Sequence, residues 1–400
     1  MQLSPEQDRA LNAIARWRTS DRQTFVMAGY AGTGKTTLLQ YFINQQSDLV
    51  TCLAPTGKAA AVLQKKLTNA RVSTIHRALY KPVPPSTVNL DVLEHQLLLF
   101  PDDAELKQAI LEEKARLAGA DVSFSLKSDR TIINGQLVIV DEASMVTRKM
   151  RRDLEETGAK ILYVGDPGQL PPVQDEGFFR THQPDAMLET VQRQALDSPI
   201  TRVSMDIRNG IEISPCHSGS FRKMAKDSVP ATIWLEYDQV ITGTNDIRRR
   251  INRFFRKKRG YDKWYPRAGD KLICLKNDYE TGLVHGYMGS AITDINYKAD
   301  FGEVMGDVVC DGAVYAGLSF YRYPFQAHYD EKAVEEPIHL RQGLSEFDFG
   351  YAITVHKSQG SEWNRVLLAD DGMKAGDREF RKRWLYTAVT RAKQELLWLY

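Results

Sequence analysis

The sequence predicts an α/β protein with two parallel-sheet domains, each interrupted by an insertion. Short apolar runs followed by Gly, Pro or Asp alternate with helical stretches near both ends of the chain. This alternation is typical of buried parallel strands joined by crossover helices. A length of 400 residues also fits two to three domains at roughly 150 residues each. No repeat with a period of about 20 to 50 residues is visible, so a solenoid is not supported.

In the first half, four short runs are expected to be buried strands, at residues 24–28, 48–54, 136–140 and 160–165. Helical stretches follow the first two runs. The segment 81–131 breaks this rhythm, because it opens with KPVPPST and continues as a charged helical segment. We therefore expect it to be an insertion.

A second α/β pattern begins near residue 238 and returns near residue 349. Between them, the chain is rich in Gly, Tyr and Val in short alternating runs, which favours a β-rich insertion. The predicted division is a first domain of residues 1–80 plus 132–190 with insertion 81–131, and a second domain of residues 191–265 plus 346–400 with insertion 266–345.

Composition excludes several classes of protein. Hydrophobic residues are 42% and charged residues 26% of the chain, which is ordinary globular usage and not a disordered one. The net charge of +2 gives no argument for or against a polyanionic partner. The four cysteines have no zinc-ligand spacing, so reduced thiols are expected. With no apolar run of about 18 residues and a charged N-terminus, we expect no membrane association and a cytoplasmic protein of a bacterium, or of its host if phage-encoded.

Residues 29–36, GYAGTGKT, match the phosphate-binding loop GxxxxGK[ST] between a strand and a helix. The glycines let successive backbone N–H groups face one concavity, and the helix N-terminus adds positive potential. Lys35 is expected to reach the β- and γ-phosphates, and Thr36 to offer its hydroxyl to Mg²⁺. The predicted cofactors are ATP and Mg²⁺. The predicted nucleotide-binding residues in this loop are Gly29, Ala31, Gly32, Thr33, Gly34, Lys35, Thr36 and Thr37.

An acidic pair ends the third predicted strand, in VIVDEAS. Asp141 is expected to hold the metal, and Glu142 to orient and deprotonate an attacking water. The alternative is that this pair only caps the helix that follows.

These motifs, with seven others in order, resemble those of superfamily 1 DNA helicases of the RecD/Dda type. LSPEQDRAL with Gln7 resembles the Q motif, whose glutamine reads adenine. The further matching blocks are APTGKAA (54–60), STIHRAL (73–79), YVGDPGQLPPV (163–173), TVQRQA (190–195), YAITVHKSQGSEW (351–363) and LYTAVTRAK (385–393).

The resemblance implies two RecA-like domains that hydrolyse ATP between them, with an SH3-like second insertion. It implies that Gln169 senses the γ-phosphate and that Arg193 and Arg391 bring positive charge from the second domain. Arginine suits this task because it keeps its proton. For Arg193, a surface position in a polar segment stays an alternative. Movement from 5′ to 3′ is implied by the family alone.

By the same resemblance, Thr56, Lys58, Thr354, His356 and Lys357 contact the backbone of single-stranded DNA. They follow predicted strands at the sheet edge where open α/β folds bind ligands. His76 either joins them or is a packed structural residue.

Other candidates are less specific. The stretch 247–259 holds eight Lys or Arg from Arg248 onward, and is either a DNA contact or a solvated helix face with its apolar stripe on the core. Phe100 and Phe124 are candidates for a strand-separating pin, or are structural. Tyr279 and Tyr287 either stack on bases or fill the β-rich insertion.

The expected partners are single-stranded DNA and junctions of single and double strands, with a single-strand-binding protein or replication and recombination proteins as further possibilities. A monomer is expected. One rival hypothesis is a motor subunit of a recombination or exonuclease complex. Another is a P-loop ATPase of a different class without unwinding activity; a GTPase is disfavoured because no N/TKxD block occurs.

Overall fold

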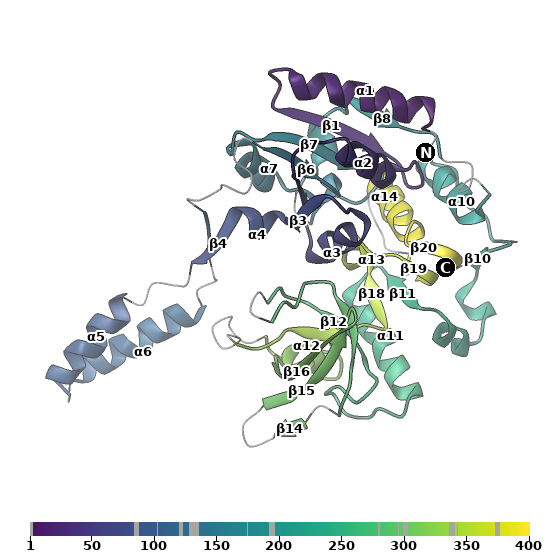
Figure 1. The fold of residues 1–400 in the computed structure, drawn as a ribbon. Coiled ribbons are helices and arrows are strands. Elements are labelled where there is room, and N and C mark those ends of the chain that lie inside the picture. The colour runs from purple at the N-terminus through teal and green to yellow at the C-terminus, as the bar shows by residue number, and fades with distance from the viewer. Residues whose placement is uncertain are drawn as a thin grey trace.

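A computed structural model of the chain gives the arrangement of its helices and strands (Figure 1). It describes residues 3–83, 88–101, 103–119, 123–127, 136–173, 175–191, 197–278, 281–294, 296–298, 303–335, 341, 343–372 and 377–400. Among the described helices, none is long and apolar enough to cross a membrane.

The first sheet is six-stranded and parallel, in the order β3-β2-β6-β7-β1-β8. Its strands are β1 (Thr24–Gly29), β2 (Val50–Ala54), β3 (Ala70–Thr74), β6 (Leu137–Val140), β7 (Lys160–Gly165) and β8 (Ala186–Leu188). Because successive side chains point to opposite faces, Met27 packs into one core and Val26 into another. The first core is shared with α1 (Pro5–Thr19), α2 (Lys35–Asn44) and α3 (Gly57–Lys66), and the second with α4 (Ile75–Leu79), α7 (Arg148–Glu155) and α8 (Phe178–Thr181).

The second sheet is also six-stranded, in the order β18-β11-β19-β20-β10-β9, and only β9 runs antiparallel. Its strands are β9 (Cys216–Ser218), β10 (Phe221–Met224), β11 (Gln239–Thr242), β18 (Ala352–Thr354), β19 (Trp363–Ala369) and β20 (Ala392–Leu399). One face packs against α10 (Pro199–Arg208), α13 (Val355–Ser358) and α14 (Arg378–Val389), and the other against α11 (Asn245–Lys258). The prediction of two parallel-sheet α/β domains is confirmed.

The helical insertion leaves the first domain through a two-stranded sheet of β4 (Tyr80–Val83) and β5 (Ser123–Leu126). Its helices α5 (Val88–Leu99) and α6 (Ala104–Gly119) pack on each other, and Figure 1 shows them apart from both parallel sheets. The segment predicted as one charged helical stretch therefore contains a pair of helices.

The second insertion is an antiparallel sheet in the order β14-β15-β13-β12-β17, with β16 paired to β15. Its strands are β12 (Lys271–Cys274), β13 (Met288–Ala291), β14 (Asn296–Lys298), β15 (Glu303–Cys310), β16 (Ala313–Phe320) and β17 (Phe347–Phe349), and α12 (Tyr323–Gln326) packs on β17. β17 lies beyond the predicted limit at residue 345. The sheet shares one continuous core with α11 and β11. Its likeness to an SH3 fold stays a prediction.

Helix α11 carries the basic stretch and joins this core. Ile251 and Phe255 are buried in it, as the apolar stripe predicts. The interpretation of all its charge as a solvated face is wrong for Arg248 and Arg256, which are 4% and 0% exposed. Arg248 pairs with the buried Asp348, 100 residues along the chain. The spacing of the charges in the helix could not reveal this partner.

Arg256 of α11 binds Asp270, which directly precedes the first strand of the β-rich insertion. Its Nε and a terminal nitrogen donate to Asp270 at 3.1 and 3.0 Å, and Asp270 is 0% exposed. A carboxylate without water stays charged only while such partners remain.

We predict that Arg256→Met lowers the free energy of unfolding by about 3 to 5 kcal/mol, because it leaves Asp270 buried and unpaired. Urea unfolding followed by circular dichroism measures the loss. The matched control is Arg148→Met, which breaks an exposed pair with Glu176 and should change little. Equal losses in both variants would contradict a stabilising role of the buried pair of Arg256 and Asp270.

Candidate functional site

The glycine-rich loop runs from the end of β1 into α2. Gly32 and Gly34 have φ of 78° and 84°, which only glycine adopts without strain, and Gly34 is the N-cap of α2. The Lys35 ammonium lies over the loop and donates to the carbonyl oxygens of Gly29 at 2.6 Å and Tyr30 at 2.9 Å. Thr36 and Thr37 are in the first turn of α2. Backbone N–H groups, a helix N-terminus and an ammonium therefore meet at one point, as a phosphate site requires.

Gln7 is placed beside this loop by the capping box at the start of α1. Its Oε1 accepts from the Ser4 N–H at 3.0 Å, and its Nε2 donates to the carbonyl of Thr33 at 3.2 Å. Gln7, which the sequence assigns to the nucleotide site, therefore lies against the phosphate loop. Its role in reading adenine stays a prediction.

Asp141 and Glu142 follow β6 at the carboxyl edge of the first sheet. The Glu142 N–H donates to Asp141 Oδ1 at 2.9 Å, and Glu142 has a φ of 54°, uncommon for a residue with a side chain. The alternative that this pair caps α7 is wrong, because Thr147 caps that helix by accepting from the N–H of Met150. Glu142 stands at the N-cap position of the 3-10 turn Ala143–Met145 and makes no side-chain cap hydrogen bond there. Strain of this kind concentrates at functional positions.

Burial dominates the electrostatics of both carboxyls. It raises the pKa of Asp141, which Lys35 and Lys66 oppose. Burial and the neighbouring Asp141 raise the pKa of Glu142 to about 7, whereas Arg391 and Lys35 lower it. A cation from the second domain and one from the first thus act on the same carboxyl.

Arg391 is held at this position by its own domain. It is 5% exposed, and its guanidinium donates to the carbonyls of Thr387 at 3.0 Å and Ser361 at 3.2 Å. Gln169 is 6% exposed, and its Oε1 has no hydrogen-bond partner among the described residues. Arg193 lies outside the described residues.

The two domains also meet through backbone groups beside Gln169. The Leu170 N–H donates to Thr387 Oγ1 at 2.9 Å, and Gln359 Nε2 donates to the Leu170 carbonyl at 2.9 Å. Arg208 lies over the ring of Tyr30, 3.9 Å from its centroid. Sequence reasoning missed Arg208, because nothing in its spacing shows that α10 reaches the phosphate loop.

The predicted DNA contacts come together from both domains. Thr56 caps α3 and Thr354 caps α13, so each begins a helix at the carboxyl end of a parallel strand. A methyl group at Gly360 would lie 3.2 Å from Cβ of Ala59, so the end of α13 lies against the first turn of α3. The structure thus brings these two sets of candidate residues to one edge.

Lys58 and Lys357 line this edge from opposite domains. Lys58 is 3.7 Å from Asp311 and 5.7 Å from the ring centroid of Tyr287, both of the β-rich insertion. Burial, and next Arg248, lower the pKa of Lys357. Burial also lowers the pKa of His356, whose ring stacks on Phe380.

His76 lies in α4, which follows β3, the strand paired with β2 in the first sheet. Its ring packs against Tyr80 with centroids 5.3 Å apart, and burial, then Lys149, lower its pKa. These surroundings fit the alternative of a packed structural residue.

The structure describes the side chain of only one of the two candidates for a strand-separating pin. Phe100, just after α5, is 62% exposed beside Leu98 and Leu99, so the tip of the helical insertion carries an open apolar group. The side chain of Phe124 and the whole of Tyr279 lie outside the described residues.

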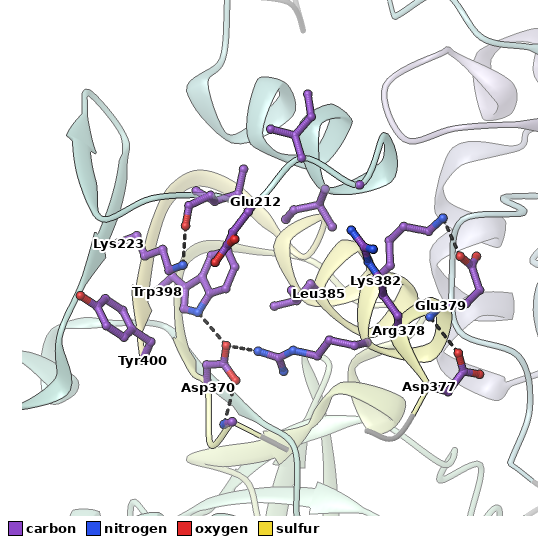
Figure 2. A pocket seen from close by; sticks show the side chains of 16 residues that line it. Glu212, Lys223, Asp370, Asp377, Arg378, Glu379, Lys382, Leu385, Trp398 and Tyr400 are labelled. Atoms are coloured by element: carbon purple, nitrogen blue, oxygen red, sulfur yellow. Dashed lines mark hydrogen bonds and ion pairs between the residues drawn. The ribbon is translucent and has the colours of Figure 1, made fainter. Parts of the chain in front are cut away.

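A pocket of about 950 Å³ lies away from the phosphate loop, at the carboxyl edge of the second sheet. Figure 2 shows Lys223 and Asp370 on its wall, with Trp398 donating to Asp370 at 3.0 Å. It contains no residue of the phosphate loop, so size alone does not identify the candidate nucleotide site.

Two parallel sheets that share a P-loop site and an arginine from the far sheet define a nucleotide-binding protein of the tandem RecA-like class. The sequence profile of the AAA domain family matches residues 2–217, and that of the UvrD-like helicase C-terminal domain matches residues 349–400. The chain belongs to the AAA domain family, and its C-terminal part matches the UvrD-like helicase C-terminal domain.

Individual relatives agree with this assignment. The chain is 27% identical to the ATP-dependent RecD2 DNA helicase of Deinococcus radiodurans, over 98% of this chain and 48% of the relative. It is 26% identical to RecBCD enzyme subunit RecD of Mycobacterium tuberculosis, over 93% of this chain and 65% of that one. The chain thus spans about half the length of the RecD2 relative.

Solved structures share the fold. The Bacteroides Pif1 helicase in complex with ADP-AlF3 and single-stranded DNA superposes with a TM-score of 0.54 at 19% identity, covering 100% of this chain and 92% of the other. At that identity the likeness concerns the fold.

The raised pKa of Glu142 predicts a pH-dependent cost in stability. Below its ordinary value of 4.5 the carboxyl is protonated in both folded and unfolded chains. Between 4.5 and about 7 only the unfolded chain has released the proton, so the free energy of unfolding falls as pH rises. Glu142→Gln does not titrate, so we expect it to be more stable than the parent at pH 8 by on the order of 2 to 3 kcal/mol, and much less so at pH 5.

Urea unfolding of the chain without nucleotide at the two pH values tests this prediction. Glu156→Gln is the matched control, because its side chain is 53% exposed. A gain for Glu142→Gln that is the same at pH 5 and pH 8 would contradict the buried, proton-retaining carboxyl.

Proposed function

We propose that this chain is an ATP-dependent DNA helicase that translocates 5′ to 3′ on single-stranded DNA and unwinds duplex. The observation that carries the proposal is that α14 of the second domain, which ends just before Arg391, hydrogen-bonds to the phosphate loop and to the segment of Gln169 in the first domain. Hydrolysis of a bound triphosphate would then require both domains together.

The residues at the interface divide the chemistry among them. Lys35 and the loop amides bind the β- and γ-phosphates, with Gly29, Ala31, Gly32, Thr33, Gly34 and Thr37 shaping the loop and Gln7 beside it. Glu142 is the general base for water, and a pKa near 7 is suited to accepting a proton at neutral pH. Gln169 orients the water or the γ-phosphate, and Arg193 and Arg391 stabilise the charge that develops on the transferred group.

The donor set also fits Mg²⁺. This ion prefers oxygen ligands and is commonly held by one or two carboxylates together with substrate phosphates. The Thr36 hydroxyl and the Asp141 carboxyl would hold it, and when bound it neutralises phosphate charge.

Opening and closing of the two domains would be coupled to DNA through the edge to which both domains contribute residues. Thr56 and Lys58 on one domain and Thr354, His356 and Lys357 on the other would grip the phosphate backbone in turn as the domains close and open. The helix N-termini of α3 and α13 add N–H donors for the phosphates. His76, packed against Tyr80, carries the weakest support for DNA contact.

The proposed division of labour follows the predicted domains. Residues 1–80 with 132–190 and residues 191–265 with 346–400 form the two halves of the motor, and the insertions 81–131 and 266–345 meet the junction. The proposed partners are single-stranded DNA and junctions with duplex, and single-strand-binding or recombination proteins. We propose a cytoplasmic monomer.

The second candidate function is a motor subunit of a larger recombination complex. It is favoured by the similarity to RecBCD enzyme subunit RecD. A P-loop ATPase without unwinding activity is the other alternative. Both predict ATP hydrolysis by the isolated chain without strand separation.

Unwinding of partial duplexes with either a 5′ or a 3′ single-stranded tail tests the proposal. We expect ATP-dependent strand separation on the 5′-tailed substrate. Lys35→Ala should abolish ATP hydrolysis and unwinding while retaining DNA binding, because it removes the phosphate-binding ammonium and leaves the DNA edge intact. The control, Arg16→Ala, removes an exposed cation of α1 outside both insertions and should behave as the parent chain.

Other outcomes separate the alternatives. Hydrolysis without unwinding of any substrate would favour the subunit or simple ATPase, and unwinding of the 3′-tailed substrate alone would overturn the polarity. Full turnover by Lys35→Ala would overturn the nucleotide site.

A further inference from the structure

One tyrosine of the second domain contacts both nucleotide-binding loops of the first. Tyr386, in α14, accepts a hydrogen bond from the Ala31 N–H at 2.8 Å and donates one to Asp166 Oδ2 at 2.8 Å. Ala31 belongs to the phosphate loop, and Asp166 begins the turn that leads to Gln169. The hydroxyl is therefore a single link between two loops and a helix of the opposite domain.

Asp166 passes this contact on to Gln169. Its Oδ1 accepts from the Gly168 N–H at 2.9 Å, and its carbonyl oxygen accepts from the Gln169 N–H at 3.3 Å. Asp166 is 0% exposed, so its carboxylate depends on these donors. Hydrogen bonds to a carboxylate are stronger than neutral ones, and bonds in a chain polarise one another.

The ring and the hydroxyl of Tyr386 have separable roles. The ring is 2% exposed and packs in the core that holds Leu170, Trp384 and Val389. Burial raises the pKa of the hydroxyl well above its ordinary value, so it keeps its proton at neutral pH. Replacement by phenylalanine would keep the packing and remove only the two hydrogen bonds.

We propose that Tyr386 is a positioning residue for ATP hydrolysis, whose hydroxyl holds the phosphate loop and the Gln169 turn in register with Arg391. Tyr386 lies in α14 and Arg391 follows directly after it, so a movement of this helix displaces both. The inference rests on the proposed ATP hydrolysis and adds a residue that acts through two loops of the first domain.

The test compares Tyr386→Phe with the parent chain in ATP hydrolysis stimulated by single-stranded DNA. We expect kcat to fall about tenfold or more while KM for ATP changes by less than about threefold, because alignment for the transition state is lost and ground-state binding is retained. A structural role alone would lower stability without this split.

Tyr237→Phe is a closely matched control. The Tyr237 hydroxyl also accepts from one group, Arg222 at 2.8 Å, and donates to a carboxylate, Glu395 at 3.0 Å, within the second domain. It should lose stability and keep kcat.

A double-mutant cycle with Asp166→Asn completes the experiment. If the hydroxyl acts through Asp166, the double variant should be no slower than the slower single variant by more than about twofold. Additive losses, or an unchanged kcat in Tyr386→Phe, would overturn the positioning role alone. A parent chain without ATP hydrolysis would overturn the proposed function and this role with it.

Discussion

A partly buried cluster of opposite charges between two sheets is the constraint on which the rest of the structure depends. Asp141 and Glu142 are half-buried next to each other, and this burial raises the pKa of both. Lys35 offsets this from the phosphate loop and Arg391 from the other domain. Because these four groups need one another, the relative position of the two domains and the state of the carboxyls are linked.

The β-rich insertion is tied to the second domain through a second set of charges, which are buried. Arg248 and Arg256 in α11 pair with Asp348 and Asp270 of the insertion, so its sheet shares a core and ion pairs with the second domain. Asp348 also accepts a hydrogen bond from His328, and Arg248 lowers the pKa of Lys357 at the proposed DNA edge. Insertion and DNA edge therefore share the same rigid support.

Much of the fold could be predicted from the sequence because parallel strands have a strong local signature. Residues 24–28 and 160–165 correspond to β1 and β7, since buried strands are short apolar runs that end at turn residues. The first helix of the pair in the first insertion, α5, was not predicted, because its apolar residues are spread around the helix instead of lying on one face. The buried arginines of α11 were missed because helical spacing shows which face of a helix a residue lies on. It does not show which acidic residue packs against that face.

The candidate site, like the fold, could be predicted only in part from the sequence. Glycine and lysine spacing located the phosphate loop, because its backbone conformation demands those residues at those positions. Tyr386 and Asp166 lie inside blocks that the sequence singled out, yet their contact joins residues far apart in the chain. Only the packing of α14 against the first domain, which no local pattern encodes, brings them together.

The central claim is that the second domain completes the ATPase site, and Arg391→Ala tests it most directly. ATP affinity measured with a fluorescent analogue and single-turnover hydrolysis with single-stranded DNA should be compared between the variant and the parent chain. The account predicts near-parental affinity and hydrolysis slowed by about a thousandfold, because the arginine acts on the transition state. Hydrolysis at the parental rate by Arg391→Ala would contradict a site shared between the two domains.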